Sequence, residues 1–259
     1  MPTYFQLKTY LRYWLDAVGS HSLHSPFFYD LYTKVINRDD RAAGFPPIEH
    51  WRTELLSSKE EIEVQDPGSG SVLHGGLRQV CDIARTSLSS PQFSRLYARL
   101  IRYFGCKNAI ELGTSLGVNA LYLSATTGTK LTTFEGVSSI ATIARRTFTN
   151  FPSHDITLVA GDIAKTLPGF LAVSPRIDFA FMDANHRYTP TLQYAGWLFE
   201  KTHHKSIVVV DDIHYTDEME QAWEALKRHR LVYASADLYR CGLLFFDPSL
   251  DKQHVVLQA

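Results

Sequence analysis

The stretch that decides the fold is Glu111-Leu112-Gly113-Thr114-Ser115-Leu116-Gly117, a glycine-containing turn that closes a short apolar segment. Glycines at positions 113 and 117 allow a tight turn and the close approach of a ligand to the backbone, and a following helix would offer free amides. Ser115 stands where the dinucleotide fingerprint has its second glycine, so the pattern is not that of a pyrophosphate-binding turn. Because ligands of open parallel sheets bind beyond the carboxyl ends of the strands, the turn predicts a ligand site.

Outward from this turn, apolar strand patterns alternate with helical ones. The predicted strands are Ala109–Leu112, Leu131–Glu135, Ile156–Ala160, Ile177–Met182, Ile207–Asp211, Leu231–Ser235 and Leu243–Phe246. Helical patterns separate the first five, which predicts parallel pairing with helices on both faces. The last link, residues 236–242, is too short for a helical crossover and predicts an antiparallel hairpin. The expected class is therefore α/β: a Rossmann-like, seven-stranded, mostly parallel sheet with an antiparallel last strand, plus an N-terminal helical region.

Residues 1–90 read as helices joined by turns, without a clear strand. One apolar stripe at helical spacing is formed by Leu7, Leu11, Trp14, Leu15 and Val18. It would pack on the core or on a second subunit, and in the second case the protein would be a homodimer. The turn-rich residues 66–71 are expected to be a surface connection, with a mobile lid above an active site as the alternative. We therefore expect two parts: a helical cap of residues 1–90, for substrate contact or dimerisation, and a ligand-binding Rossmann-like domain of residues 91–259.

Composition limits the partners. The 26 basic and 27 acidic residues give a net charge of −1, so no field would concentrate nucleic acid or anionic lipid, and small molecules are the expected partners. The three cysteines are far apart, which fits a reducing compartment. The N-terminus has no basic-then-apolar signal, and no apolar run reaches the roughly 18 residues of a membrane span. The expected location is the cytoplasm, away from membranes.

Acidic residues close the next two predicted strands. Glu135 lies about twenty residues after the glycine turn, where Rossmann folds place an acid that accepts hydrogen bonds from ribose hydroxyls. Gly161-Asp162 ends the third strand, where a carboxylate could accept from an adenine amino group. Each acid alone could be a solvated strand-end residue, but together after this turn they indicate a nucleoside.

Over about residues 85–246 the chain resembles the class I S-adenosylmethionine-dependent methyltransferases, closest to the catechol O-methyltransferase-like branch and its sugar O-methyltransferase relatives. The resemblance implies S-adenosylmethionine as cofactor, with Glu135 as the ribose-binding acid and Asp162 on the adenine side. The implied cofactor-binding residues are Glu111, Gly113, Thr114, Ser115, Gly117, Glu135, Gly161, Asp162 and Asp183. Residues 1–84 lie outside it.

Three carboxylates follow the fourth and fifth strands: Asp183, Asp211 and Asp212. Brought together without a cation they would repel, whereas a hard divalent ion, Mg²⁺ or Mn²⁺, relieves the repulsion. A structural acidic cluster is the alternative, with Asp212 as a helix cap, although Thr216 and Asp217 are better placed for capping. The all-aspartate set resembles that of the sugar-modifying relatives.

Proton transfer is assigned to His186 or Asp183. The catechol-type enzymes have a catalytic lysine three residues after their first ligand, and His186 occupies that place here. A histidine can accept a hydroxyl proton near neutral pH, so His186 is the candidate base and His214 the second candidate. A satisfied loop histidine is the alternative in both cases.

The expected function is transfer of a methyl group from S-adenosylmethionine to a small hydroxylated acceptor, assisted by a divalent metal; methylation of nitrogen or carbon stays open. A serine hydrolase is the rival class, because Gly113-Thr114-Ser115-Leu116-Gly117 also satisfies G-x-S-x-G and His74-Gly75-Gly76 imitates an oxyanion loop. Its triad would be Ser115, Asp211 and His214 or His254. The third hypothesis is a non-catalytic nucleoside-binding protein.

Overall fold

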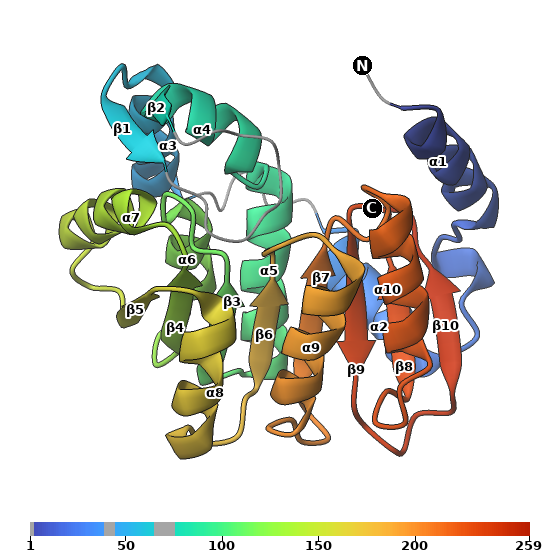
Figure 1. Ribbon diagram of the computed structural model, residues 1–259. Helices are drawn as coiled ribbons and strands as arrows, with labels where there is room; N and C mark the ends of the chain where they lie inside the picture. Colours follow the sequence, from blue (N-terminus) through green and yellow to red (C-terminus); the bar gives the residue numbers. More distant parts are fainter. Residues whose placement is uncertain (1–2, 39–44, 65–75) are drawn as a thin grey trace. The chain divides into compact units, whose positions relative to one another are not determined.

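The computed structural model describes residues 3–38, 45–64 and 76–259 (Figure 1). The chain forms two compact units: residues 1–39 together with 175–259, and residues 40–174. Both the turn at residues 66–71 and the His74-Gly75 pair lie outside the described residues. The boundary at residue 90 runs through the second unit, so the division into residues 1–90 and 91–259 stays a prediction.

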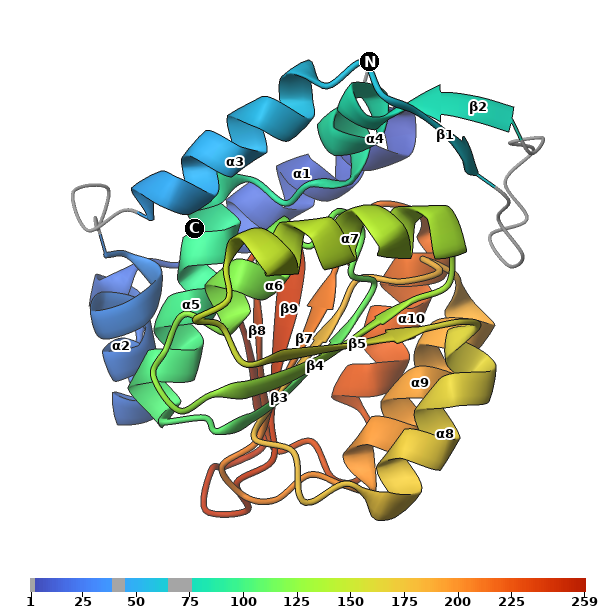
Figure 2. The same ribbon diagram turned by 90° about the vertical axis from the view of Figure 1, so that its left-hand side faces the viewer.

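The unit of residues 40–174 carries the glycine turn (Figure 2). Its strands β3 (Asn108–Leu112), β4 (Lys130–Glu135) and β5 (Ile156–Ala160) pair in parallel, β3 with β4 and β4 with β5. The helices are α3 (Pro46–Ser57), α4 (Val80–Ser87), α5 (Pro91–Phe104), α6 (Val118–Leu123), α7 (Ser138–Asn150) and α8 (Ile163–Val173). Helix α5 begins where the Ser90 side chain accepts a hydrogen bond from the Phe93 amide, and it ends at Gly105, which has a left-handed conformation.

A hairpin in this unit corrects one expectation. β1 (Glu61–Val64) and β2 (Gly76–Gln79) pair antiparallel, so the prediction that the first ninety residues contain no strand is wrong. The four residues Glu61–Val64 alternate charged and apolar side chains, but four residues are too few for the period to stand out. Their partner strand comes only after residues 65–75, so nothing local in the sequence reveals the pairing.

The other unit combines residues 1–39 with residues 175–259 (Figure 1). Its strands are β6 (Phe179–Met182), β7 (Ile207–Asp211), β8 (Ala234–Asp237), β9 (Cys241–Phe245) and β10 (Gln253–Val256), in the order β10-β8-β9-β7-β6. β6 and β7 are parallel, whereas β9 runs antiparallel to both β7 and β8. The helices are α1 (Tyr4–Asp16), η1 (Ser20–Ser22), α2 (Pro26–Leu31), η2 (Tyr32–Ile36), α9 (Tyr188–Phe199) and α10 (Asp217–Lys227). The mostly parallel α/β sheet with an antiparallel final hairpin is confirmed.

Two details of these strands differ from expectation. The sixth predicted strand begins at Ala234 rather than Leu231, and β10 is an additional strand that pairs in parallel with β8. β10 is short, and its Gln253-His254 start gives no apolar run, so its strand character depends on its neighbour β8.

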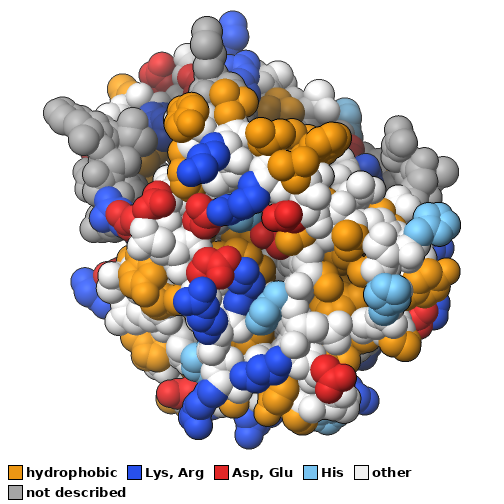
Figure 3. All heavy atoms as spheres, turned by 90° about the vertical axis from the view of Figure 1, so that its right-hand side faces the viewer, with side chains coloured by type: hydrophobic (Ala, Val, Ile, Leu, Met, Phe, Trp, Pro, Cys, Tyr) orange, Lys and Arg blue, Asp and Glu red, His pale blue; other side chains and the backbone are white. Residues whose placement is uncertain are grey.

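Helix α1 presents an apolar face to solvent. Thr3 caps it reciprocally with Gln6, and its large exposed side chains are Tyr4, Leu7, Tyr10, Leu11, Trp14 and Leu15. Figure 3 shows hydrophobic side chains interspersed with Lys and Arg on the side where α1 lies in Figure 1. The stripe therefore does not pack on the core, and the homodimer stays a prediction. Within the described ranges, every helix is too short or too polar to cross a bilayer.

Candidate functional site

The glycine turn contains three residues with positive φ, which glycine adopts readily and serine only at an energetic cost. Gly113 and Gly117 have φ of 100° and 84°, and Ser115, which is not a glycine, has φ of 48°. At Gly117 a Cβ atom would lie 2.8 Å from a ring carbon of Phe148, so both the backbone angle and the packing require glycine. A strained serine inside a tight turn persists only when its surroundings hold it, and such positions concentrate at ligand sites.

Glu135 holds this turn through its carboxylate. Its Oε2 accepts a hydrogen bond from the Ser115 amide and its Oε1 from the Val137 amide, both at 2.9 Å. The residue is 8% exposed at the end of β4. These two bonds fix the orientation of the acid at the end of β4, and binding of ribose hydroxyls by Glu135 stays a prediction.

Glu111, in contrast, is fully buried beneath the turn. Its carboxylate accepts hydrogen bonds from Asn119 Nδ2 at 2.9 Å and from Thr133 Oγ1 at 2.6 Å. Thr133 is also hydrogen-bonded to Thr114, which ties the turn to β4. Sequence reasoning missed Asn119 and Thr133, because neither belongs to a motif and only the pairing of β3 with β4 brings Thr133 to Glu111.

Gly161 and Asp162 follow β5 as predicted. The Gly161 amide donates to the Glu135 carbonyl at 2.8 Å, and its φ is 129°. The Asp162 carboxylate accepts from the Ala164 amide at 3.0 Å and so caps α8. Its side chain remains 41% exposed. Capping does not exhaust a carboxylate's acceptor positions, so an adenine-side role stays a prediction.

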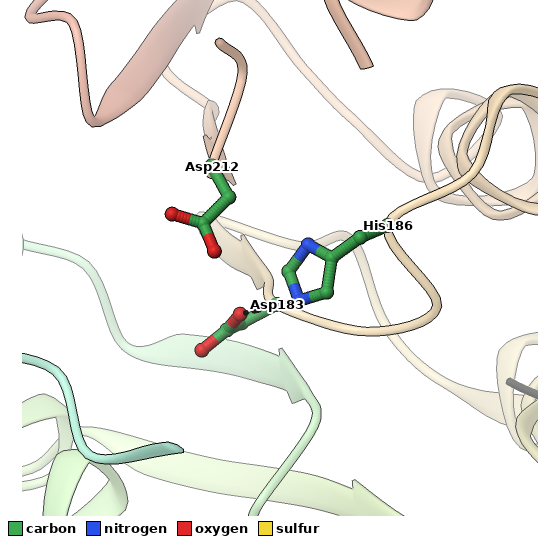
Figure 4. A group of neighbouring side chains, drawn as sticks. All are labelled: Asp183, His186 and Asp212. Carbon is green, nitrogen blue, oxygen red and sulfur yellow. Dashed lines mark ion pairs between the residues drawn. The ribbon is translucent and has the colours of Figure 1, made fainter. Parts of the chain in front are cut away.

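A second group lies at the ends of β6 and β7 in the other unit (Figure 4). Asp183, His186 and Asp212 each bring a ligand atom within 4.8 Å of the other two, and His186 Nε2 lies 3.2 Å from Asp183 Oδ1. His186 and Asp212 have positive φ, 27° and 53°, as does Asn185 at 68°. The left-handed turn at Asp212 ends the alternation of β7 and brings this carboxylate to Asp183.

Asp211 has a different environment from its neighbour Asp212. It is completely buried, and Arg240 donates to both of its oxygens, at 2.8 and 3.3 Å. Burial and the negative charge of Asp183 raise the pKa of Asp211 and the Arg240 guanidinium opposes them, with a net pKa of about 7. The expected metal set of Asp183, Asp211 and Asp212 therefore differs from the observed group, in which His186 takes the place of Asp211. Sequence reasoning missed Arg240.

The charges around His186 change its chemistry. Burial lowers its pKa, but the hydrogen bond and negative charge of Asp183, with Asp212 and Asp211, outweigh burial and raise the pKa to about 9. Burial and Asp183 likewise raise the pKa of Asp212. A ring with this pKa is protonated at neutral pH, so His186 can act as a base only when the carboxylate charge beside it is offset.

The hydrolase triad does not assemble from its expected members. The Ser115 hydroxyl is hydrogen-bonded to the Ser87 hydroxyl at 2.6 Å, which is not a base, and Asp211 is paired with Arg240. The two histidines are also bonded elsewhere, His214 to Asp237 and His254 to Ser235. His214, the second candidate base, is 8% exposed and stacks on Tyr239. Thr216, not Asp212, caps α10.

Comparison with known proteins agrees with this geometry. Residues 110–213 match the family described as "Methyltransferase domain". A search of curated proteins finds no match. Among solved structures, cofactor-bound Rv0187 from MTB is 17% identical with a TM-score of 0.59, covering 85% of this chain and 94% of that one. The O-methyltransferase TomG from Streptomyces achromogenes, in complex with SAM, is 18% identical with a TM-score of 0.54, covering 62% and 82%.

A Bacillus cereus O-methyltransferase in complex with SAH gives the same TM-score of 0.54 at 16% identity, covering 62% of this chain and 83% of that one. At such identities these structures establish the fold, which is the Rossmann-like methyltransferase fold. The matched domain begins in β3 and ends just after Asp212, so it spans the glycine turn and the strand ends that carry Glu135, Asp162 and Asp183.

Proposed function

We propose that the protein transfers the methyl group of S-adenosylmethionine to a hydroxyl oxygen of a small acceptor, assisted by a divalent cation. The observation that carries this proposal is the group of Asp183, His186 and Asp212 at the carboxyl ends of β6 and β7. These strand ends are where open α/β sheets bind their ligands. Two of the similar structures are O-methyltransferases, which supports oxygen as the acceptor atom.

Cofactor binding is assigned to the turn and the strand ends around it. Glu135 would accept from the ribose hydroxyls, and the backbone of Gly113–Gly117 would lie against the cofactor. Gly161 and Asp162 would meet the adenine, and Asp183 completes the proposed set. Glu111 is buried, so its contribution is to hold Thr133 and Asn119, and through Thr133 the turn, in place.

The donor set fits a divalent cation. Two carboxylates and an imidazole have ligand atoms within 4.8 Å of one another, and the raised pKa of His186 reflects the negative charge of the carboxylates around it. The carboxylates of Asp183 and Asp212 suit Mg²⁺ or Mn²⁺, which prefer oxygen ligands, and would hold the ion while His186 beside them serves proton transfer. A bound divalent ion would supply Lewis acidity that lowers the pKa of an acceptor hydroxyl.

The chain's own groups provide orientation and proton transfer. His186 Nε2 faces Asp183 Oδ1 at 3.2 Å, which leaves Nδ1 as the ring atom available to take a proton. With the carboxylate charge offset, the ring pKa falls toward neutrality and His186 becomes a competent base. Because the sulfonium is already an activated methyl donor, alignment of acceptor and methyl group is the protein's main contribution.

Calorimetric titration tests both halves of the proposal. S-adenosylhomocysteine should bind the wild-type protein, and Glu135→Gln should weaken binding by at least tenfold, because the acceptor loses its charge and one of its two oxygens becomes an N–H donor. Mn²⁺ should bind the wild type, and Asp212→Asn should abolish that heat. Asp251→Asn, at an exposed site in the same unit, is the matched control and should change neither titration.

Two outcomes would contradict the proposal separately. Absence of S-adenosylhomocysteine binding by the wild type would remove the methyltransferase function itself. Unaltered Mn²⁺ binding in Asp212→Asn would remove the metal assignment while leaving cofactor binding intact. Cofactor binding without methyl transfer to any hydroxylated acceptor, with or without Mn²⁺, would favour the non-catalytic nucleoside-binding alternative.

A further inference from the structure

We propose that Ser87 and Trp51, both outside the matched methyltransferase domain, are positioning residues that hold the glycine turn of residues 113–117 in its cofactor-binding conformation. The inference rests on the proposed cofactor role of this turn. It assigns the support of part of the cofactor site to helices α3 and α4, which precede the matched domain.

The first contact comes from the last residue of α4. Ser87 Oγ lies 2.8 Å from the Ile83 carbonyl, to which it donates, and 2.6 Å from Ser115 Oγ. A hydroxyl has one proton, so with the Ser87 proton on the carbonyl, Ser115 must be the donor in the bond between the two serines. The Ser115 hydroxyl is thereby oriented toward α4, and its amide donates to Glu135.

The second contact comes from α3. Trp51 Nε1 donates to Thr147 Oγ1 at 3.0 Å, and the Thr147 hydroxyl donates to the Leu116 carbonyl at 2.7 Å. An indole N–H can only donate, which sets the direction of this chain. Ser115 and Leu116 are consecutive, so α3 and α4 hold adjacent residues of the turn.

Helices α3 and α4 also pack on the start of α6, which the turn leads into. Figure 2 shows α3 and α4 on the same side as α6 and α7. One continuous apolar cluster joins them, formed by Ile48, Leu55, Val80, Ile83, Ala84, Ala98, Leu116, Val118, Leu121, Tyr122 and Ile143. Tyr122 of α6 donates to the Glu49 carboxylate of α3, and Glu49 also pairs with Arg52. Helices α3 and α4 are thus packed into the hydrophobic core of this unit.

The backbone of Ser115 explains why such support is needed. A non-glycine residue at φ of 48° is costly, so the turn would relax without outside bonds. Relaxation would move the Ser115 amide away from Glu135, the proposed ribose acid. Loss of the Ser87 bond should therefore weaken cofactor binding, because Ser87 is hydrogen-bonded to Ser115, whose amide donates to Glu135. By linkage, cofactor binding should in turn stabilise α4.

The test compares Ser87→Ala with Thr86→Ala by calorimetry with S-adenosylhomocysteine. Thr86 is the matched control, because its hydroxyl also bonds back to carbonyls of α4 but is exposed and does not contact the turn. Removing one hydrogen bond that orders the turn should raise the Kd about three- to tenfold in Ser87→Ala. Thr86→Ala should keep the wild-type Kd. Trp51→Phe, which keeps an aromatic ring and loses the donor, should raise the Kd by a similar factor.

Two further measurements separate positioning from general destabilisation. Ser115→Ala removes the same bond from its other end, so the double variant with Ser87→Ala should bind no more weakly than the weaker single variant. Hydrogen exchange should quicken at the amides of residues 113–117 in Ser87→Ala, while those of β5 stay protected as in the wild type. Bound S-adenosylhomocysteine should slow exchange at α4 in the wild type.

Wild-type affinity in Ser87→Ala, or fully additive losses in the double variant, would overturn the inference while leaving the proposed function in place. Equal weakening by Thr86→Ala would overturn it too, since only general destabilisation of α4 would then be at work. A wild-type protein that does not bind S-adenosylhomocysteine would overturn the proposed function and this inference together.

Discussion

Replacement of Gly117 by alanine tests the geometry of the glycine turn most directly. At φ of 84° a Cβ atom costs about 1–2 kcal/mol of backbone energy. The same atom would lie 2.8 Å from Phe148 Cε1 and 3.1 Å from its Cζ, an overlap of the kind that costs about 1–3 kcal/mol. Gly117→Ala should therefore lower the free energy of unfolding by about 2–5 kcal/mol. It should also weaken S-adenosylhomocysteine binding, since relief of the overlap displaces the turn.

Gly105 provides the matched control for this substitution. It also has a left-handed backbone, with φ of 67°, but a Cβ atom there would meet nothing within 4 Å. Urea unfolding followed by circular dichroism should give a loss of about 1–2 kcal/mol for Gly105→Ala, and cofactor binding should be unchanged. Adding Phe148→Leu to Gly117→Ala should recover part of the steric loss. Equal destabilisation at positions 117 and 105 would refute the close contact with Phe148.

Three other consequences follow from charge and packing in the unit of residues 175–259. Arg240→Met leaves the buried Asp211 carboxylate without its bidentate partner and should lower the free energy of unfolding in urea by about 2–3 kcal/mol. The loss should be smaller than for a fully buried pair, because the guanidinium is 35% exposed. An unchanged urea midpoint would contradict the pairing. The pKa of His186 is about 9 in the folded protein and 6.5 in the unfolded chain. Without metal, protonation of His186 should therefore stabilise the fold fully below pH 6.5, and this contribution should be lost as the pH rises through about 9. A metal-free imidazole resonance titrating near 6.5 in NMR would refute that environment, and saturating Mn²⁺ should remove the pH-dependent term from urea unfolding. Gly242→Ala would drive a Cβ atom into the Trp223 ring and should destabilise by about 1–3 kcal/mol; wild-type unfolding would show that β9 does not pack on α10 there.

Much of the fold could be predicted, because its signals are local. Apolar runs mark the parallel strands, and Ser90, Pro91 and Gly105 mark both ends of α5. The short link before Gly242 correctly predicted the antiparallel hairpin, since no helix fits in it. The β1–β2 hairpin and β10 were missed because each depends on a distant partner and carries too few residues for a periodic pattern.

The candidate sites divide in the same way. The sequence predicted that Glu135, Asp183 and Asp212 lie at the carboxyl ends of strands, and the structure places all three there. The distinction between Asp211 and Asp212 did not, because adjacent aspartates are equivalent in a linear pattern. One is buried against Arg240, which arrives from the link between β8 and β9, and the other turns toward His186. Only the antiparallel pairing of β9 with β7 brings that arginine to the carboxylate.

By itself, the sequence determined the α/β class, the approximate positions of most strands along the chain and the chemistry available at their carboxyl ends. These properties depend on apolar periodicity, on glycine's access to positive φ and on residue type, all of which are local. The tertiary structure decided which groups are paired, how a buried or crowded carboxylate shifts its pKa, and that Ser87 and Trp51 hold the glycine turn. Such properties depend on burial and on distances between residues far apart in the chain, and those exist only once the chain has folded.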